Sequence, residues 1–274
     1  MFDKQKIIDY TEDKHLKDGG YFFAKVEPSS GLDTYYAVKI LKMLGMKPQD
    51  PLGVKRFFLD MEASEGIDDI TGLYLNLETL KEIGYDLTRF RCYESIVKET
   101  QNRHGGFGTV GELYVEIASE LETTYRAVVI SNDLNCSLDK NSLVEFIFSF
   151  QNKDGGFGSK GLSLLSTTYY ALSILQELGE RKKIAKIPNF LLDIERSNFF
   201  NFYLEDIFWL TESLQLLKQK PRDTKTIISF LEMCIRIDGG FSRSINLGIS
   251  TLEDTYYAVT ILKRLEEYGI QEFV

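Results

Sequence analysis

Four short glycine-rich segments recur along the 274-residue chain and constrain its fold more than any other feature. These markers are Asp18-Gly19-Gly20-Tyr21, His104-Gly105-Gly106-Phe107, Asp154-Gly155-Gly156-Phe157 and Asp238-Gly239-Gly240-Phe241. Their second glycines are 86, 50 and 84 residues apart (106 − 20, 156 − 106, 240 − 156), which corresponds to two, one and two units of about 43 residues. Two units have lost the glycine pair: Glu65-Gly66-Ile67-Asp68-Asp69 fills the first gap and Ser197-Asn198-Phe199-Phe200 fills the second. The sequence therefore predicts six repeats.

Each repeat is predicted to contain two helices. After every marker, an apolar run follows a residue of a type that favours the N-cap position. These predicted starts of six inner helices are Asp33, Asp69, Thr123, Thr167, Asp206 and Asp254. Gly45, Gly84 and Gly179 follow apolar runs, where a left-handed residue ends a helix. Amphipathic segments predict outer helices at Lys55–Glu62, Tyr93–Thr100, Leu143–Phe150, Ile187–Ile194 and Thr226–Cys234.

Six helical hairpins can stack as an open solenoid or close into a ring. Open solenoids usually need atypical polar end repeats, and the sequence shows none. We therefore expect an all-α fold, a closed barrel of six hairpins called an (α/α)6 toroid, that forms a single domain over residues 1–274.

Composition excludes several classes of function. The formal net charge is −9 (32 Lys+Arg against 41 Asp+Glu), and no basic block interrupts it, which argues against nucleic acid as a partner. No apolar run approaches the roughly 18–20 residues that span a bilayer, and the N-terminus lacks a signal-peptide core. Cys92, Cys136 and Cys234 form no disulfide framework or zinc knuckle by their spacing. We expect a cytoplasmic protein.

The marker with its flanks carries a family resemblance. Residues 150–158, Phe-Gln-Asn-Lys-Asp-Gly-Gly-Phe-Gly, and more weakly residues 101–108, resemble the Q-x-x-D-G-G-[FW]-G repeat of protein prenyltransferase β subunits and squalene/terpenoid cyclases. The similarity to these prenyltransferase and squalene oxidase repeats covers essentially the whole chain. It implies a toroid whose central funnel holds an isoprenoid chain.

Aromatic residues near the starts of the inner helices are expected to face that funnel. They are Tyr35, Tyr36, Tyr74, Tyr125, Tyr169, Tyr170, Phe208, Trp209, Tyr256 and Tyr257. Aromatic faces suit polyene chains and carbocations, although aromatic residues at helical spacing also fill ordinary protein cores. As candidate substrate contacts we single out Tyr36, Tyr74, Tyr125, Tyr170, Phe208, Trp209 and Tyr257.

The resemblance also implies a metal site that this sequence lacks in part. In the related prenyltransferases, Asp, Cys and His hold a catalytic Zn²⁺ that activates a substrate thiol. Asp206 matches the aspartate, but Phe208 replaces the cysteine and Asp254 replaces the histidine. His15 and His104 lie in marker loops, so they do not restore the set. We therefore expect no zinc site.

The related cyclases instead protonate an alkene with a carboxyl group of a D-x-D-D motif, which burial and neighbouring carboxylates keep protonated. Three segments resemble this motif, although each lacks its first aspartate: residues 66–69, 203–206 and 251–255. They make Asp68, Asp206 and Asp254 the candidate catalytic acids. An acidic pair at a helix start is also a common capping arrangement, so both interpretations stay open.

A diphosphate substrate would need cations at the funnel mouth. Arg126 and Arg243 are the main candidates, beside Lys160 and Arg103, and Arg243 lies closest to the basic loop of the related prenyltransferases. If the inner helices are parallel, an acidic ring also lies at this mouth: Asp33, Asp68, Asp69, Glu122, Glu205, Asp206, Glu253 and Asp254. Such a ring suits Mg²⁺ bridging a diphosphate, or a cationic partner.

Together these features predict chemistry on an isoprenoid diphosphate, as transferase or cyclase, without the zinc site. One alternative is a non-catalytic toroid that binds a lipid or a peptide. Another is the β-type subunit of a heterodimer, which would need an α-subunit-like protein partner as the related prenyltransferases do.

Overall fold

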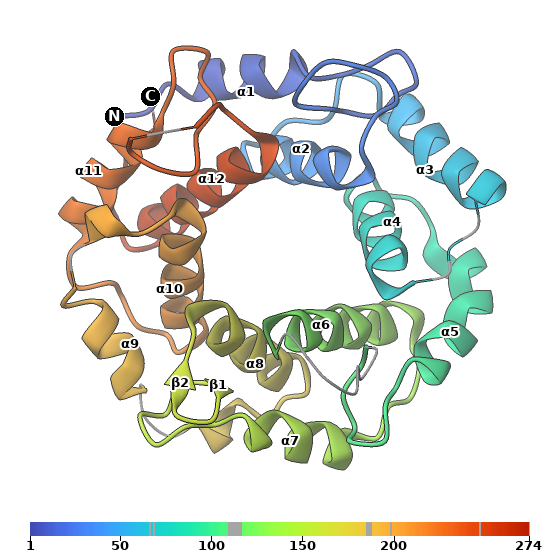
Figure 1. The fold of residues 1–274 in the computed structure, drawn as a ribbon. Helices are drawn as coiled ribbons and strands as arrows, with labels where there is room; N and C mark the ends of the chain where they lie inside the picture. The colour runs from blue at the N-terminus through green and yellow to red at the C-terminus, as the bar shows by residue number, and fades with distance from the viewer. Residues whose placement is uncertain are drawn as a thin grey trace.

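The structure is a computed structural model that describes residues 1–65, 67, 69–108, 117–184, 188–197, 199–246 and 248–273. Its helices form two concentric rings (Figure 1). The inner helices are α2 (Gly31–Met43), α4 (Ile70–Glu82), α6 (Ile117–Leu134), α8 (Leu165–Glu177), α10 (Leu204–Leu216) and α12 (Leu252–Glu267). The outer helices are α1 (Lys4–Glu12), α3 (Pro51–Glu65), α5 (Glu94–Glu99), α7 (Lys140–Ser149), α9 (Asn189–Ile194) and α11 (Thr224–Cys234). The predicted outer segments therefore form helices, with shifted ends.

Short elements connect the helices. Three 3₁₀ helices are η1 (Leu87–Tyr93), η2 (Arg181–Lys183) and η3 (Phe199–Asn201). Strands β1 (Gly158–Ser159) and β2 (Leu162–Ser163) form an antiparallel hairpin in the connection between α7 and α8. None of the described helices combines the length and the apolar character needed to cross a membrane.

The ring closes, as the absence of polar end repeats predicts. Each inner helix contacts the next one along the chain, and α12 contacts α2 (Figure 1). The two chain ends also meet, because the Phe2 N–H donates to the Glu272 carbonyl at 2.6 Å. The chain therefore folds as the expected closed toroid rather than as an open solenoid.

Each glycine marker is a turn that joins an outer helix to an inner one. Gly239 has φ +91°, and a Cβ built there would lie 2.5 Å from the Lys6 carbonyl oxygen, so only glycine fits without a shift. Phe241 is fully buried, and its N–H donates to the Thr255 hydroxyl at 3.0 Å. The same N–H to threonine bond ties the other three markers to α2, α6 and α8. In each of these four repeats, the marker turn is therefore hydrogen-bonded to the inner helix that follows it.

The inner helices begin earlier than predicted, with one exception. Asp69 caps α4 as expected, but Ser30 and Thr251 cap α2 and α12, and Asp33 and Asp254 lie in the first turn instead. Thr167 and Asp206 likewise lie inside α8 and α10, while Thr123 lies well inside α6. The prediction was wrong because the N-cap positions of α2, α8, α10 and α12 come three residues earlier and α6 begins six residues before Thr123. At Asp206 the N3 carboxylate reaches back to the Tyr203 N–H, as in a capping box.

The ends of the inner helices follow the predicted pattern. Gly45, Gly84 and Gly179 all have positive φ directly after the C-caps of α2, α4 and α8. Asn135, Lys218 and Gly269 take the same left-handed conformation after α6, α10 and α12. Left-handed residues at this position satisfy the last helix carbonyls.

Candidate functional site: the central funnel

A cavity of about 700 Å³ lies at the centre of the ring, in the size range of small-molecule sites. All ten aromatic residues expected to face the funnel line it. Arg126 and Arg243 line it too, together with Asp254 and Glu253. The structure therefore brings most of the candidate residues into one cavity, while their roles there stay predictions.

A closed belt of aromatic rings surrounds this cavity, with one ring from each inner helix. The belt consists of Tyr35, Tyr74, Tyr125, Tyr169, Phe208 and Tyr256, and each ring contacts the next at centroid distances of 5.8, 6.3, 6.4, 5.6 and 5.9 Å, with 6.3 Å closing the circle. These distances lie in the range of favourable aromatic pairs. In five of the six helices the belt residue is the fifth residue of the helix, so the repeat itself builds the belt.

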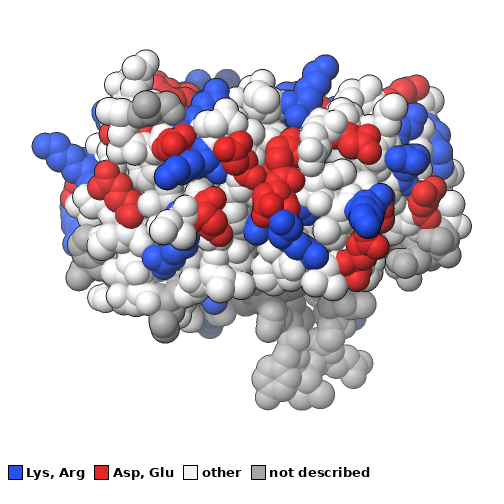
Figure 2. All heavy atoms as spheres, turned by 90° about the horizontal axis from the view of Figure 1, so that it is seen from above, with Lys and Arg blue, Asp and Glu red and all other residues white. Residues whose placement is uncertain are grey.

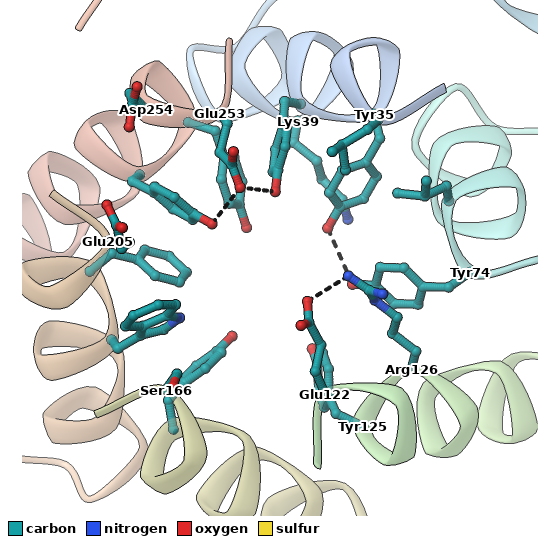
Figure 3. Close-up of a pocket in the computed structure, with 18 of the residues that line it drawn as sticks. Tyr35, Lys39, Tyr74, Glu122, Tyr125, Arg126, Ser166, Glu205, Glu253 and Asp254 are labelled. Atoms are coloured by element: carbon teal, nitrogen blue, oxygen red, sulfur yellow. Dashed lines mark hydrogen bonds and ion pairs between the residues drawn. The ribbon is translucent and has the colours of Figure 1, made fainter. Parts of the chain in front are cut away.

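The two arginines at the cavity already have carboxylate partners. Arg126 pairs with Glu122 at 2.5 Å (Figure 3). It also donates to the Thr71 hydroxyl at 2.7 Å. The Nε of Arg243 donates to Glu205 at 2.8 Å. An anionic ligand would therefore have to compete with glutamates for both side chains.

The neighbouring acids Glu253 and Asp254 have different surroundings. Glu253 turns toward the funnel, where its Oε1 accepts from the hydroxyls of Tyr36 and Tyr257, both at 2.9 Å (Figure 3). The Asp254 carboxylate accepts from the Thr251 hydroxyl at 2.6 Å. Burial raises the pKa of Asp254 to about 6, helped by the nearby charges of Glu205 and Glu253.

The other candidate acids are placed differently. Asp206 does not line the described cavity wall; its carboxylate caps the backbone of Tyr203, and burial raises its pKa. Asp68 lies outside the described residues. Of the expected acidic ring, Glu122, Glu205, Glu253 and Asp254 line the cavity, whereas Asp69 is exposed and serves as a helix cap.

Sequence reasoning missed a buried charged cluster deeper on the same inner helices. Lys39 of α2 donates to Glu78 and Glu82 of α4 at 2.8 and 2.7 Å, and both Lys39 and Glu78 line the cavity. These two carboxylates raise the pKa of Lys39 against the opposing effect of its burial. The signal was Lys39, one of two lysines inside the apolar run 37–44, which lies four residues after Tyr35 and thus on the same face of the helix.

The residues present do not fit the zinc site that the resemblance implies. Phe208 offers a ring packed 4.6 Å from that of Tyr257, and Asp206 is engaged in its cap. Across the part of the chain that the structure describes, no three His, Cys, Asp or Glu residues form a group that could hold a metal ion. These residues therefore do not supply the zinc ligands of the related prenyltransferases.

Fold and funnel define an (α/α)6 toroid with an aromatic, internally charge-paired central site. The model of the prenyltransferase alpha-alpha toroid domain matches residues 2–68, 67–199 and 203–272, and the chain belongs to this family. Among 22 matching chains of solved structures is a Candida albicans protein geranylgeranyltransferase-I complexed with GGPP, at a TM-score of 0.65 and 15% identity. That match covers 87% of this chain and 85% of the other. A comparison with curated proteins found no match.

Proposed function

We propose that the funnel binds an isoprenoid chain and that the protein acts on an isoprenoid diphosphate without the zinc of the related prenyltransferases. The observation that carries this proposal is the closed aromatic belt inside a cavity of about 700 Å³. Each methylene that such a cavity removes from water stabilises the complex by about 0.8 kcal/mol. The family supports the same class of ligand, and the C. albicans structure holds GGPP.

The diphosphate would lie at the arginines. Among the described lining residues, Arg126 directly follows the belt residue Tyr125, and Arg243 pairs with Glu205 in the first turn of α10. Each could exchange its glutamate for a phosphate oxygen. Guanidinium groups bind phosphate well because their donors match its oxygens. Mg²⁺ prefers oxygen ligands, and it would reach the funnel bound to the diphosphate, because no three acidic side chains among the described residues form a group that could hold a metal ion. Bound there, it would neutralise diphosphate charge.

Asp254 is the strongest of the three candidate acids. It lines the cavity, and with a pKa of about 6 a minor fraction of its carboxyl group is protonated at neutral pH. A carboxyl group with a raised pKa can donate a proton to a substrate.

The cytoplasmic location expected from the sequence stays a prediction.

To test the proposal, the protein is incubated with labelled farnesyl or geranylgeranyl diphosphate, with and without Mg²⁺. The label bound to the protein and the label in new organic-soluble product are then measured. Arg126→Gln and Arg243→Gln should each weaken binding about tenfold, whereas Arg222→Gln, which removes an exposed arginine paired with Glu195, should not. Asp254→Asn should abolish product and keep binding. Failure of either diphosphate to bind would contradict the proposal.

A second candidate is a non-catalytic toroid that binds a lipid or a peptide. It is favoured by the pairing of both arginines with glutamates and by the five carboxylates (Glu78, Glu122, Glu205, Glu253 and Asp254) that face three cations (Lys39, Arg126 and Arg243) in the cavity wall. Binding without product in the same assay would select it. Product formation only after a co-purifying second chain is added would instead select the β-type subunit.

A further inference from the structure

One sector of the funnel wall, formed by α2, α10 and α12, carries two aromatic rings in addition to those of the belt. Tyr36, Phe208, Tyr256 and Tyr257 make up this sector cluster. The rings of Tyr36 and Tyr256 lie 5.2 Å apart, and those of Phe208 and Tyr257 lie 4.6 Å apart. Tyr257 also contacts Tyr36 and Tyr256, at 6.2 and 5.8 Å. Four π-systems therefore face the cavity from one side.

A carboxylate lies among these rings. Glu253 Oε1 accepts from the hydroxyls of Tyr36 and Tyr257 at 2.9 Å each, so two members of the sector cluster hold it in place (Figure 3). Burial and the charge of Glu253 raise the pKa of Tyr36 well above its ordinary value, and burial does the same for Tyr257. Both phenols are neutral donors at neutral pH, and the negative charge belongs to Glu253.

Glu253 differs from the other glutamates of the cavity wall. Glu78, Glu122 and Glu205 pair with Lys39, Arg126 and Arg243 respectively. Among the residues that the structure describes, Glu253 has no cation within ion-pair distance, and its hydrogen-bond partners are the two phenols. The sector cluster thus combines an unneutralised carboxylate with aromatic faces inside the cavity.

We propose that Glu253 and the sector cluster form a subsite for an alkylammonium group, and that the apolar part of the same ligand lies along the rest of the funnel. Aromatic faces attract quaternary and protonated amines through their quadrupole, and the carboxylate adds charge attraction in a partly desolvated place. The occupant is a small amphiphile rather than a basic protein segment, because the subsite lies within a cavity of ordinary small-molecule size. This proposal uses the same funnel as the proposed function. Arg126 lies on α6, outside this sector, whereas Arg243 pairs with Glu205 of α10, the helix that also carries Phe208.

The chain contains a single tryptophan, Trp209, and it lines the cavity. Its fluorescence therefore reports occupancy of the funnel directly. We would titrate the protein with decyltrimethylammonium, with the uncharged-overall decyldimethylamine oxide and with decyl sulfate, all below their micelle concentrations. The three probes share one apolar chain and differ in the charge of the head group.

The cationic probe should bind with one-to-one stoichiometry and at least tenfold more tightly than the amine oxide, and decyl sulfate should bind most weakly. Glu253→Gln should reduce the preference for the cation about tenfold, which equals about 1.4 kcal/mol. Glu266→Gln, which removes one carboxylate from the same helix where it pairs with Lys263, should keep the preference. Phe208→Leu should weaken the cationic probe more than the amine oxide.

Equal affinity for the cationic probe and the amine oxide in the unmodified protein would overturn the proposal, and this comparison needs no variant to fold. An unchanged preference in a folded Glu253→Gln protein, or binding of many probes per chain, would overturn it as well. Isoprenoid diphosphates titrated in parallel separate the two proposals. If the diphosphates bind but the preference for the cationic probe is missing, this inference fails and the proposed function stands. If the preference is present but the diphosphates do not bind, the proposed function fails and this inference stands.

Discussion

Single residues decide which partners each carboxylate of the cavity wall has. From the sequence, Glu253 and Asp254 form one acidic pair, of which Asp254 is the candidate acid, and nothing indicates that their side chains point in different directions. In the structure, Glu253 accepts hydrogen bonds from two phenols of the funnel, whereas Asp254 accepts one from Thr251 at the start of the helix. No sequence pattern carries that distinction, because it depends on a helix start that lies three residues earlier than the predicted cap.

The raised pKa of Asp254 predicts how stability varies with pH. Burial favours the protonated form, so the folded state holds this proton up to about pH 6 while the unfolded chain releases it near 3.8. The contribution to stability is therefore complete below about pH 4 and is lost as the pH rises to about 6. Asparagine does not ionise, so the Asp254→Asn protein does not suffer this loss. The change in unfolding free energy caused by the substitution should therefore be about 2 kcal/mol more favourable at pH 7 than at pH 4.

Urea unfolding of both proteins at the two pH values measures this difference. Asp223→Asn is the matched control, because Asp223 caps α11 in an exposed position and hydrogen bonds from Thr226 lower its pKa. That substitution should lower stability at pH 7 instead. An Asp254→Asn effect that is the same at both pH values would contradict the account of this residue.

At the scale of elements, most of the helices could be predicted because the same pattern of outer helix, turn and inner helix occurs six times along the sequence. The four markers, with the segments 65–69 and 197–200 that lack the glycine pair, located the connections from outer to inner helices, and aromatic residues after them form the belt. The Lys39 to Glu78 pair was missed because it joins two helices that are neighbours only in space. The structure of residues 109–116 and the position of Asp68 lie outside the described residues.

The marker turns predict a contrast between two glycines of similar backbone conformation. Gly45 has φ +76° and no atom within 4 Å of a built Cβ, whereas Gly239 has φ +91° and lies against the Lys6 carbonyl. Gly45→Ala should therefore cost only the backbone strain, about 1–2 kcal/mol. Gly239→Ala should cost roughly 1–3 kcal/mol more, because α1 must also shift. Chemical unfolding measures both values, and equal losses would show that the turn does not lock α1.

For the whole molecule, closure of the ring is the feature that makes a funnel possible. Acidic and basic side chains alternate on the side of the ring seen in Figure 2, without a broad surface of one sign. At the cavity, by contrast, three cations and three glutamates form ion pairs. Six repeats without atypical polar end units predicted the closed shape, but the pairing of those charges depends on contacts between helices.

Closure predicts that the position of the chain ends is not essential. Phe2 and Phe273 form a parallel bridge, and α1 lies beside both ends (Figure 1). A circular permutant that joins the present ends by a short linker and opens between Met46 and Lys47, in an exposed connection, should fold to the same ring. It should unfold in one cooperative transition and keep the emission spectrum of Trp209. A permutant that folds only in part would contradict a ring closed by contacts between α2 and α12.

The most direct test of the central claim is the fluorescence of Trp209 during titration with geranylgeranyl diphosphate, geranylgeraniol and inorganic diphosphate. Because Trp209 is the only tryptophan and lines the cavity, its signal changes when the funnel fills. Binding of an isoprenoid within the aromatic belt predicts a saturable one-to-one change with both isoprenoids, tighter for the diphosphate, and none with inorganic diphosphate alone. An unchanged Trp209 signal while calorimetry records isoprenoid binding would place the ligand elsewhere and contradict the account.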